Sequence, residues 1–210
     1  MKLYNSIGPN PRVVAMFIAE KGIEIDTVDV DIMGGENRQS DYLTKNPGGQ
    51  TPALEMANGE VIGEITVICD YLDEMYPENS LMGNSPEEKA QTRMWCRRID
   101  LKIGENMANG FRFGEGHDMF KDRMLVCPNA SDDLKAMAAD GLKWLDPLLT
   151  GPYICGDRFS VADISLYCFL DFFTSMGQVI DPALENVHAW MARVAERPSV
   201  AASVHPSMRG

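Results

Sequence analysis

Residues 51–64, TPALEMANGEVIGE, contain the signals that decide the fold of the first part of the chain. Asn58-Gly59 lies between two short apolar runs and is the strongest short-range signal for a β-hairpin, because both central turn positions need a positive φ. Pro52 begins the first run, and proline is tolerated at the start of an edge strand because it has no N–H to donate. This stretch therefore predicts two antiparallel strands, the first an edge strand.

The segments on either side alternate in type. Residues 64–76, EITVICDYLDEMY, place apolar side chains on one helical face before Pro77 stops the helix. Upstream, residues 1–5 and 24–32 are typical of strands, and residues 11–21 and 37–46 of helices. The predicted order is β-α-β-α-β-β-α.

The remainder of the chain is predicted to be helical. Residues 77–86, PENSLMGNSP, have the composition of a linker. Ser85-Pro86-Glu87-Glu88 predicts a capping box that opens a long helix to about residue 109, and Ser160-Val161-Ala162-Asp163 predicts a second box before an apolar helix. Glycines and prolines in 110–133 predict a break. We therefore expect an α/β domain over 1–77 and an all-helical domain over 86–210.

Composition excludes several classes of function. A net charge of −12 argues against a nucleic-acid partner, since phosphate contacts need Lys or Arg. No apolar run approaches the roughly 20 residues of a membrane helix, and the first residues lack the regions of a signal peptide, so we expect a cytoplasmic protein with no membrane partner. Five dispersed cysteines and three dispersed histidines contain no C-x-x-C pair and no zinc spacing, so reduced thiols and no metal are expected.

Three motifs, in their order along the chain, resemble the glutathione S-transferase family. They are NPGGQTPALEMANGEVIGEITVICDYLDEMYP (46–77), GDRFSVADISLY (156–167) and ERPSV (196–200). Each alone is a weak signal, but their joint order is specific and the resemblance covers nearly the whole chain. It implies a thioredoxin-like N-terminal domain followed by an all-helical C-terminal domain, with glutathione as co-substrate.

The resemblance also implies a set of glutathione contacts. Thr51-Pro52 is expected to be a cis bond, with the Thr51 backbone pairing with the cysteinyl part of glutathione; a merely tight turn is the alternative. Glu64 would receive the γ-glutamyl ammonium, although an acidic residue is also favoured there by the helix dipole. Ile65 stands where the family usually has Ser or Thr, so the α-carboxylate would lose one hydrogen bond. Arg38 and Gln50 fall in segments that resemble the contact regions for the glycyl carboxylate, and Arg38 is equally explained as a solvated charge.

Residues 8–11, GPNP, follow the first strand where thioredoxin-type enzymes carry Cys-Pro-x-Cys. Gly8 and Pro11 replace the two thiols, and neither acts as an acid or base. Gly8 is expected to bind glutathione by letting it approach the backbone closely. Asn10 is expected to be the N-cap with Pro11 as the first helical residue, leaving the N–H groups of Asn10, Arg12 and Val13 to stabilise a thiolate. Fungal transferases that begin Gly-Pro-x-Pro and work without the usual Tyr or Ser are similar; activation by the Ser6 hydroxyl is the alternative, and Tyr4 is expected in the core.

Candidates for the site of the second substrate lie between the two predicted helix starts of the second domain. Phe111 and Phe113, with several methionines and Phe120, are candidates to line an apolar pocket against the N-terminal domain, and His117 is a polar candidate beside them. Core packing explains some of these residues equally well.

The expected function is a dimeric cytoplasmic transferase that joins the glutathione thiolate to small hydrophobic electrophiles, in detoxification. The alternative is a binding or regulatory protein of the same fold without catalysis, which Gly8 and Ile65 favour.

Overall fold

The structure is a computed structural model that describes residues 1–208 and divides into two compact units. Met1–Met82 and the segment from Arg197 onward form the first unit, and Gly83–Glu196 form the second. This differs from the expected division at 1–77 and 86–210, because the helix at Pro198–Ala202 packs with the first unit.

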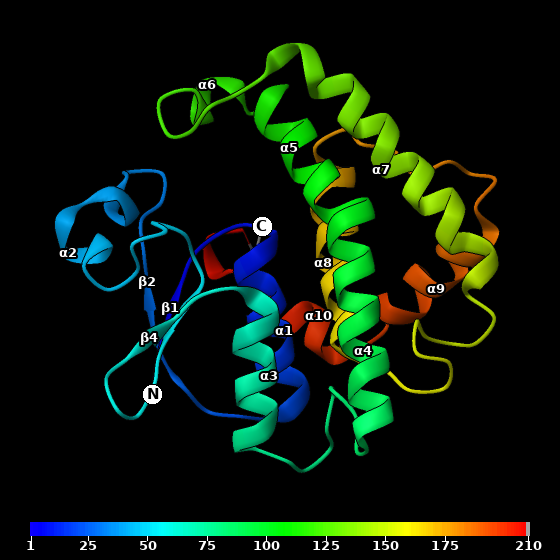
Figure 1. Cartoon of the computed structure of the whole chain (residues 1–210), viewed down its shortest axis with the longest axis horizontal. Helices are drawn as coiled ribbons and strands as arrows, with labels where there is room; N and C mark the ends of the chain where they lie inside the picture. Colours follow the sequence, from blue (N-terminus) through cyan, green and yellow to red (C-terminus); the bar gives the residue numbers. More distant parts are fainter. Residues whose placement is uncertain (209–210) are drawn as a thin grey trace. The chain divides into compact units, whose positions relative to one another are not determined.

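The first unit has the predicted order of elements (Figure 1). It contains β1 (Lys2–Asn5), α1 (Pro9–Lys21), β2 (Asp26–Asp29), the 3-10 turn η1 (Glu36–Arg38), α2 (Ser40–Leu43), β3 (Ala53–Glu55), β4 (Val61–Ile62) and α3 (Ile65–Met75). The C-terminal segment adds α10 (Pro198–Ala202) and the 3-10 turn η5 (Pro206–Met208). A thioredoxin-like arrangement of helices around a small mixed sheet results.

The sheet has the strand order β2-β1-β3-β4. β1 runs parallel to β2 and antiparallel to β3, with Tyr4 beside Ala53, and β3 runs antiparallel to β4. The hairpin predicted at Asn58-Gly59 is confirmed, and Gly59 has a φ of 86°. The expectation that Pro52 begins an edge strand is wrong, because β3 lies inside the sheet; Pro52 is tolerated because it precedes the first paired residue.

Both faces of this sheet carry core residues. Tyr4 and Ala53 pack with Val30 and Tyr42 on one face, and the rings of Tyr4 and Tyr42 meet edge to face at 6.0 Å. The buried side chains of Leu3 in β1 and Leu54 in β3 point to the opposite face, because side chains alternate along a strand. Helices α1 and α3 pack together (Figure 1). Tyr4 is thus a core residue, as predicted.

A buried ion pair fastens the end of α3 to α1 and to the linker. The carboxylate of Asp73 accepts from Lys21 Nζ at 3.1 Å, from the Ser80 hydroxyl at 2.5 Å and from the Leu81 N–H at 2.9 Å. The side chains of Lys21 and Asp73 are 1% and 2% exposed. Burial of two charges is tolerated here because every one of these groups has a hydrogen-bond partner.

The second unit is helical throughout, as predicted. Its elements are α4 (Pro86–Ile99), the π-helical segment η2 (Asp100–Gly104), α5 (Glu105–Phe113), α6 (His117–Phe120), η3 (Pro128–Ala130), α7 (Ser131–Leu145), η4 (Asp146–Leu148), α8 (Val161–Ser175) and α9 (Glu185–Ala195). The predicted break coincides with the turns around α6. The long helix predicted to about residue 109 continues to Phe113 through the π-helical segment.

The π-helical segment is stabilised from two sides. The buried Asn106 side chain donates to the carbonyls of Leu101 and Lys102, at 3.2 and 3.0 Å, which the widened turn leaves exposed. Gly141 of α7 lies against the same turn, and a Cβ there would lie only 2.6 Å from the Lys102 carbonyl oxygen. The absence of a side chain at Gly141 therefore lets α7 pack closely against the π-helical segment.

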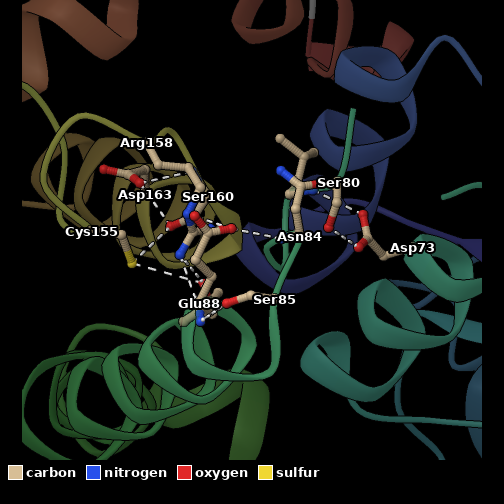
Figure 2. Close-up of polar contacts among 11 residues, drawn as sticks. Asp73, Ser80, Asn84, Ser85, Glu88, Cys155, Arg158, Ser160 and Asp163 are labelled. Carbon is tan, nitrogen blue, oxygen red and sulfur yellow. Dashed lines mark hydrogen bonds and ion pairs between the residues drawn. The ribbon is translucent and has the colours of Figure 1, made fainter. Parts of the chain in front are cut away.

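Both predicted helix starts in the second unit are formed, and Figure 2 shows them. The Ser85 hydroxyl caps α4 by accepting from the Glu88 N–H, but the Glu88 carboxylate takes the N–H of Asn84, one residue earlier than a capping box requires. Ser160 and Asp163 form a complete box, and Asp163 is fully buried. Burial raises the pKa of Asp163, opposed by its hydrogen bonds.

No helix within residues 1–208 is long and apolar enough to cross a membrane. In the same residues no cluster of three or more His, Cys, Asp or Glu side chains is arranged to hold a metal ion. The five cysteines form no disulfide, and four of them are buried.

Candidate active site

Three loops of the first unit meet at one edge of its sheet. β1 leads into Ser6–Gly8, β3 is preceded by Thr51-Pro52, and β4 leads into Glu64 at the start of α3. Because β1 and β4 both run antiparallel to β3, the C-terminal ends of β1 and β4 and the N-terminal end of β3 lie at the same end of the sheet. The strand register thus brings together most of the residues that the sequence predicted for glutathione.

The Ser6 side chain is already engaged by the protein. Its hydroxyl donates to the Val30 carbonyl at 2.7 Å, and the residue is 6% exposed. A hydroxyl has one proton to donate, so this bond removes the donor that a glutathione thiolate would need from Ser6. The serine thus serves to tie the end of β1 to the end of β2.

The helix starts two residues earlier than predicted. Gly8 is the N-cap with a φ of 117°, Pro9 is the first helical residue, and Asn10 is inside the helix, so the expectation of Asn10 as N-cap is wrong. The reason is that glycine adopts a positive φ without a steric penalty, which lets the chain turn at Gly8. Pro9 then occupies the favoured first helical position.

This start changes the set of available donors. Pro9 and Pro11 have no N–H, and the N–H of Arg12 bonds to the Gly8 carbonyl at 3.3 Å, so the expectation of Arg12 and Val13 as open donors is wrong. Within residues 1–208, Asn10 is left with the open N–H of this turn, and its side-chain amide has no hydrogen-bond partner there. Asn10 therefore offers donors from both backbone and side chain.

The Thr51-Pro52 peptide bond is cis, as predicted. Neither the N–H nor the carbonyl of Thr51 has a hydrogen-bond partner within residues 1–208, and the residue is half-buried. The preceding carbonyl, of Gln50, is held by the Tyr42 hydroxyl at 2.7 Å and the Asn46 amide at 2.8 Å. These bonds position the loop so that a free backbone edge is presented at Thr51.

The start of α3 offers a second group of donors. Glu64 is the N-cap, exposed, with a φ of 65° that is rare for a residue with a side chain. The first helical bond runs from the Ile68 N–H to the Glu64 carbonyl, so the N–H groups of Ile65, Thr66 and Val67 point out of the helix end. Thr66 was not among the residues predicted for the site. It directly follows Ile65, the position at which the resemblance leads us to expect Ser or Thr.

The two residues expected at the glycyl end of glutathione are exposed. Arg38 lies in η1 with its guanidinium against Gly35, and Gln50 directly precedes Thr51. The Asn37 amide donates to the Gly49 carbonyl at 2.6 Å, which links the two segments. Both side chains therefore extend from connected loops of the first unit.

Tyr4 is excluded as the group that activates a thiol. Its hydroxyl donates to the Glu55 carboxylate at 2.6 Å, and this bond, together with burial, raises the pKa of Tyr4 to about 12. A phenol with this pKa stays protonated at neutral pH, and its one proton is taken by Glu55.

The residues expected near the second substrate lie in α5 and α6 of the second unit. Phe111 belongs to an aromatic cluster with Phe120, Phe172 and Phe173, at ring separations of 5.9–6.4 Å. Phe113 is half-buried at the end of α5, and the His117 side chain is 37% exposed beside Asp118. The second unit thus has a cluster of aromatic side chains that includes Phe111, and a partly exposed histidine on α6.

Comparison with known proteins gives a consistent result. Residues 7–75 match the family description "Glutathione S-transferase, N-terminal domain" and residues 128–193 match "Glutathione S-transferase, C-terminal domain". A glutathione S-transferase domain-containing protein from Marinobacter aquaeolei VT8 is 36% identical with a TM-score of 0.88, over 95% of this chain and all of that one.

Two further proteins extend the comparison. Glutathione S-transferase 2 of Saccharomyces cerevisiae is 28% identical over 92% of this chain and 84% of its own length. A glutathione transferase homologue from Sulfitobacter, solved with bound glutathione, is 25% identical with a TM-score of 0.80, over 96% of this chain and 95% of that one.

A thioredoxin-like domain with an open backbone edge beside a cis-proline, followed by a helical domain, is the architecture that the sequence motifs predicted. Together with these matches it shows that the chain belongs to the glutathione S-transferase family.

Proposed function

We propose that this protein joins the thiolate of glutathione to small hydrophobic electrophiles, and that the first turn of α1 stabilises the thiolate without a catalytic Tyr, Ser or Cys. The observation that carries the proposal is the contrast between two side chains. The Ser6 hydroxyl is bonded to Val30, while the N–H and amide of Asn10 are open at the start of a helix whose dipole favours an anion.

The remaining contacts follow the three loops. The free N–H and carbonyl of Thr51 pair with the cysteinyl backbone of glutathione as an added strand. The N–H groups at the start of α3 take the γ-glutamyl carboxylate, and Glu64 takes the ammonium. Arg38 and Gln50 are assigned to the glycyl carboxylate.

The reaction proposed is a nucleophilic substitution or addition. The thiol proton leaves to solvent when glutathione binds as a thiolate, the sulfur forms a bond to an electrophilic carbon, and a leaving group departs in the substitution case. Asn10 acts on the sulfur by donating hydrogen bonds, which lowers the pKa of the bound thiol. We assign Phe111, Phe113 and His117 to the site of the hydrophobic electrophile because all three are half-buried on α5 and α6 and Phe111 belongs to an aromatic cluster.

A homodimer is part of the proposal, and two surfaces support it. On α3, the exposed apolar residues Val67 and Met75 lie with the exposed Glu74. On α4, the exposed Met94 lies beside Arg93 in a chain that is acidic overall. The α3 surface of one copy is therefore complementary to the α4 surface of a second, because apolar residues meet apolar residues and Glu74 meets Arg93.

Charge reversal tests the dimer. Arg93→Glu is expected to lower the dimer fraction in analytical ultracentrifugation, and adding Glu74→Arg is expected to restore it. Lys143→Glu, at an exposed position of α7, is the matched control and leaves the dimer unchanged. A monomer in the unmodified protein, or equal loss with the control, contradicts this interface.

Detoxification in the cytoplasm is the role we assign, supported by the absence of disulfides among the five cysteines. The experiment that tests the transferase proposal has two steps: retention on immobilised glutathione, then product formation from glutathione and a chlorodinitrobenzene. Retention without turnover favours the alternative, a glutathione-binding or regulatory protein, which Gly8 and Ile65 support. Failure of retention contradicts both.

A further inference from the structure

The C-terminal segment of the chain lies along α1, as Figure 1 shows for α10. Its contacts reach both ends of the helix. Near the end of α1, the Glu20 carboxylate accepts two hydrogen bonds from Arg197, each at 2.7 Å, and a third from the Ser199 hydroxyl. Near the start of α1, the segment meets Arg12.

Arg12 is bonded on two sides. Its guanidinium donates to the Ser203 hydroxyl through Nε at 3.4 Å and to the Val200 carbonyl through Nη2 at 3.5 Å. Its own N–H donates to the Gly8 carbonyl at 3.3 Å. The same residue therefore closes the first turn of α1 and ties that turn to the end of α10.

This tie matters because the first turn lacks the usual capping interactions. Gly8 provides no side-chain cap, and no acidic residue lies in the first turn. Prolines at the first and third helical positions leave Asn10 with the open N–H of the turn, so the orientation of this one residue sets the direction of both its N–H and its side-chain amide. A hydrogen bond weakens steeply when donor and acceptor are misaligned.

On the basis of the proposed function, we propose that α10 is a positioning element for the thiolate site, acting through the guanidinium hydrogen bonds of Arg12 to Ser203 and Val200. Arg12 itself does not touch glutathione in this scheme. It fixes the turn that carries Asn10, and the pair of bonds between Arg197 and Glu20 keeps α10 in place to receive it.

Two variants of Arg12 separate the effect of its hydrogen bonds from the effect of its positive charge. Arg12→Met removes both the charge and the hydrogen bonds, whereas Arg12→Lys keeps the charge and loses the forked donor geometry. Arg193→Met is the matched control, because Arg193 in α9 also donates to a backbone carbonyl, that of Pro152 at 2.9 Å, but lies in the other unit.

The measurement is the thiolate absorbance of bound glutathione against pH, with kcat, KM for glutathione and thermal unfolding on the same proteins. Arg12→Met and Arg12→Lys are each expected to raise the pKa of the bound thiol by about one unit, so that roughly tenfold less thiolate is present below that pKa. The value of kcat falls by a similar factor, KM changes little, and Arg193→Met leaves the thiol pKa unchanged.

Three results overturn the inference: an unchanged thiol pKa in Arg12→Met, full recovery of the original pKa in Arg12→Lys, which assigns the effect to charge, or an equal shift in Arg193→Met. If Arg12→Met does not fold, Ser203→Ala decides, since it removes the Nε acceptor; a shift in the same direction supports the inference and no shift overturns it. If the thiol of bound glutathione in the unmodified protein has the pKa of free glutathione, the proposed function is contradicted. Failure of the inference about Arg12 is therefore distinguishable from failure of the proposed function.

Discussion

Substitutions at Ser6 and Asn10 distinguish the proposed activation of the glutathione thiol by the first turn of α1 from activation by the Ser6 hydroxyl. Ser6→Ala removes a buried hydroxyl that donates to Val30, and the Val30 carbonyl keeps a second partner in the Ile32 N–H at 2.9 Å. The expected cost is about 1 kcal/mol of folding free energy, the typical net contribution of one hydrogen bond. In a chain of this size this lowers Tm by roughly 2–4 °C, with no change in the pKa of the bound thiol.

Asn10 is expected to behave in the opposite way. Asn10→Ala keeps the N–H and removes the amide, and a hydrogen bond to a charged group contributes about 1.5–3 kcal/mol. Since one pKa unit corresponds to about 1.4 kcal/mol, the pKa of the bound thiol rises by roughly 1–2 units. Asn10→Pro removes the N–H as well and disfavours the helical conformation of Pro9, so its effect is larger.

The assay is thiolate absorbance of bound glutathione against pH for the unmodified protein and the three variants, with thermal unfolding to separate activation from stability. If Ser6→Ala alone brings the pKa to that of free glutathione, Ser6 is the activating residue. If Asn10→Ala and Asn10→Pro both leave the pKa unchanged, the first turn of α1 does not hold the thiolate.

Three further predictions concern binding and stability. Ile65→Ser is expected to tighten glutathione binding by up to about 1 kcal/mol, roughly fivefold, in calorimetric titration, and unchanged or weaker binding means that the γ-glutamyl end docks elsewhere. Asp73→Ala is expected to cost roughly 3–5 kcal/mol in denaturant unfolding, because it leaves Lys21 buried without its charge partner, and a loss below 1 kcal/mol contradicts the buried pair. Burial by itself raises the pKa of Glu20, but hydrogen bonds from Arg197 and Ser199 outweigh it, so the pKa is lowered in the folded state. The stabilisation is then present above the ordinary carboxyl pKa of 4.5 and lost as pH falls through the lower folded value, so Glu20→Gln is expected to flatten the acid limb of the stability curve, and an unchanged limb refutes this.

Much of the fold was predictable because its signals are local. Asn58-Gly59 specifies a hairpin through the φ values of two adjacent residues, and Ser160 with Asp163 specifies a helix start through contacts within one turn. The cis bond at Thr51-Pro52 was predictable from the family resemblance. Such features depend on neighbours in sequence and do not require knowledge of the rest of the chain.

The start of α1 was not predictable to the residue. Asn10 followed by Pro11 has the pattern of a helix start, and so does Gly8 followed by Pro9, because both place a turn-forming residue before a proline. The end of β1, fixed by its pairing with β2 and β3, leaves the turn at Gly8. That choice moved Asn10 into the helix and reduced the open donors of the turn to its own.

Local conformational preferences and the linear order of motifs were enough to predict the two-part architecture, the hairpin, the helix starts of the second unit and the likeness to glutathione S-transferases. The folded structure was needed to show that the Ser6 hydroxyl donates to the Val30 carbonyl, that β3 lies inside the sheet, and that α10 packs against α1. The physical reason is common to all three. A hydrogen-bond donor, a strand edge or a helix face is available or occupied according to partners distant in sequence, and those partners are brought near only when the chain folds.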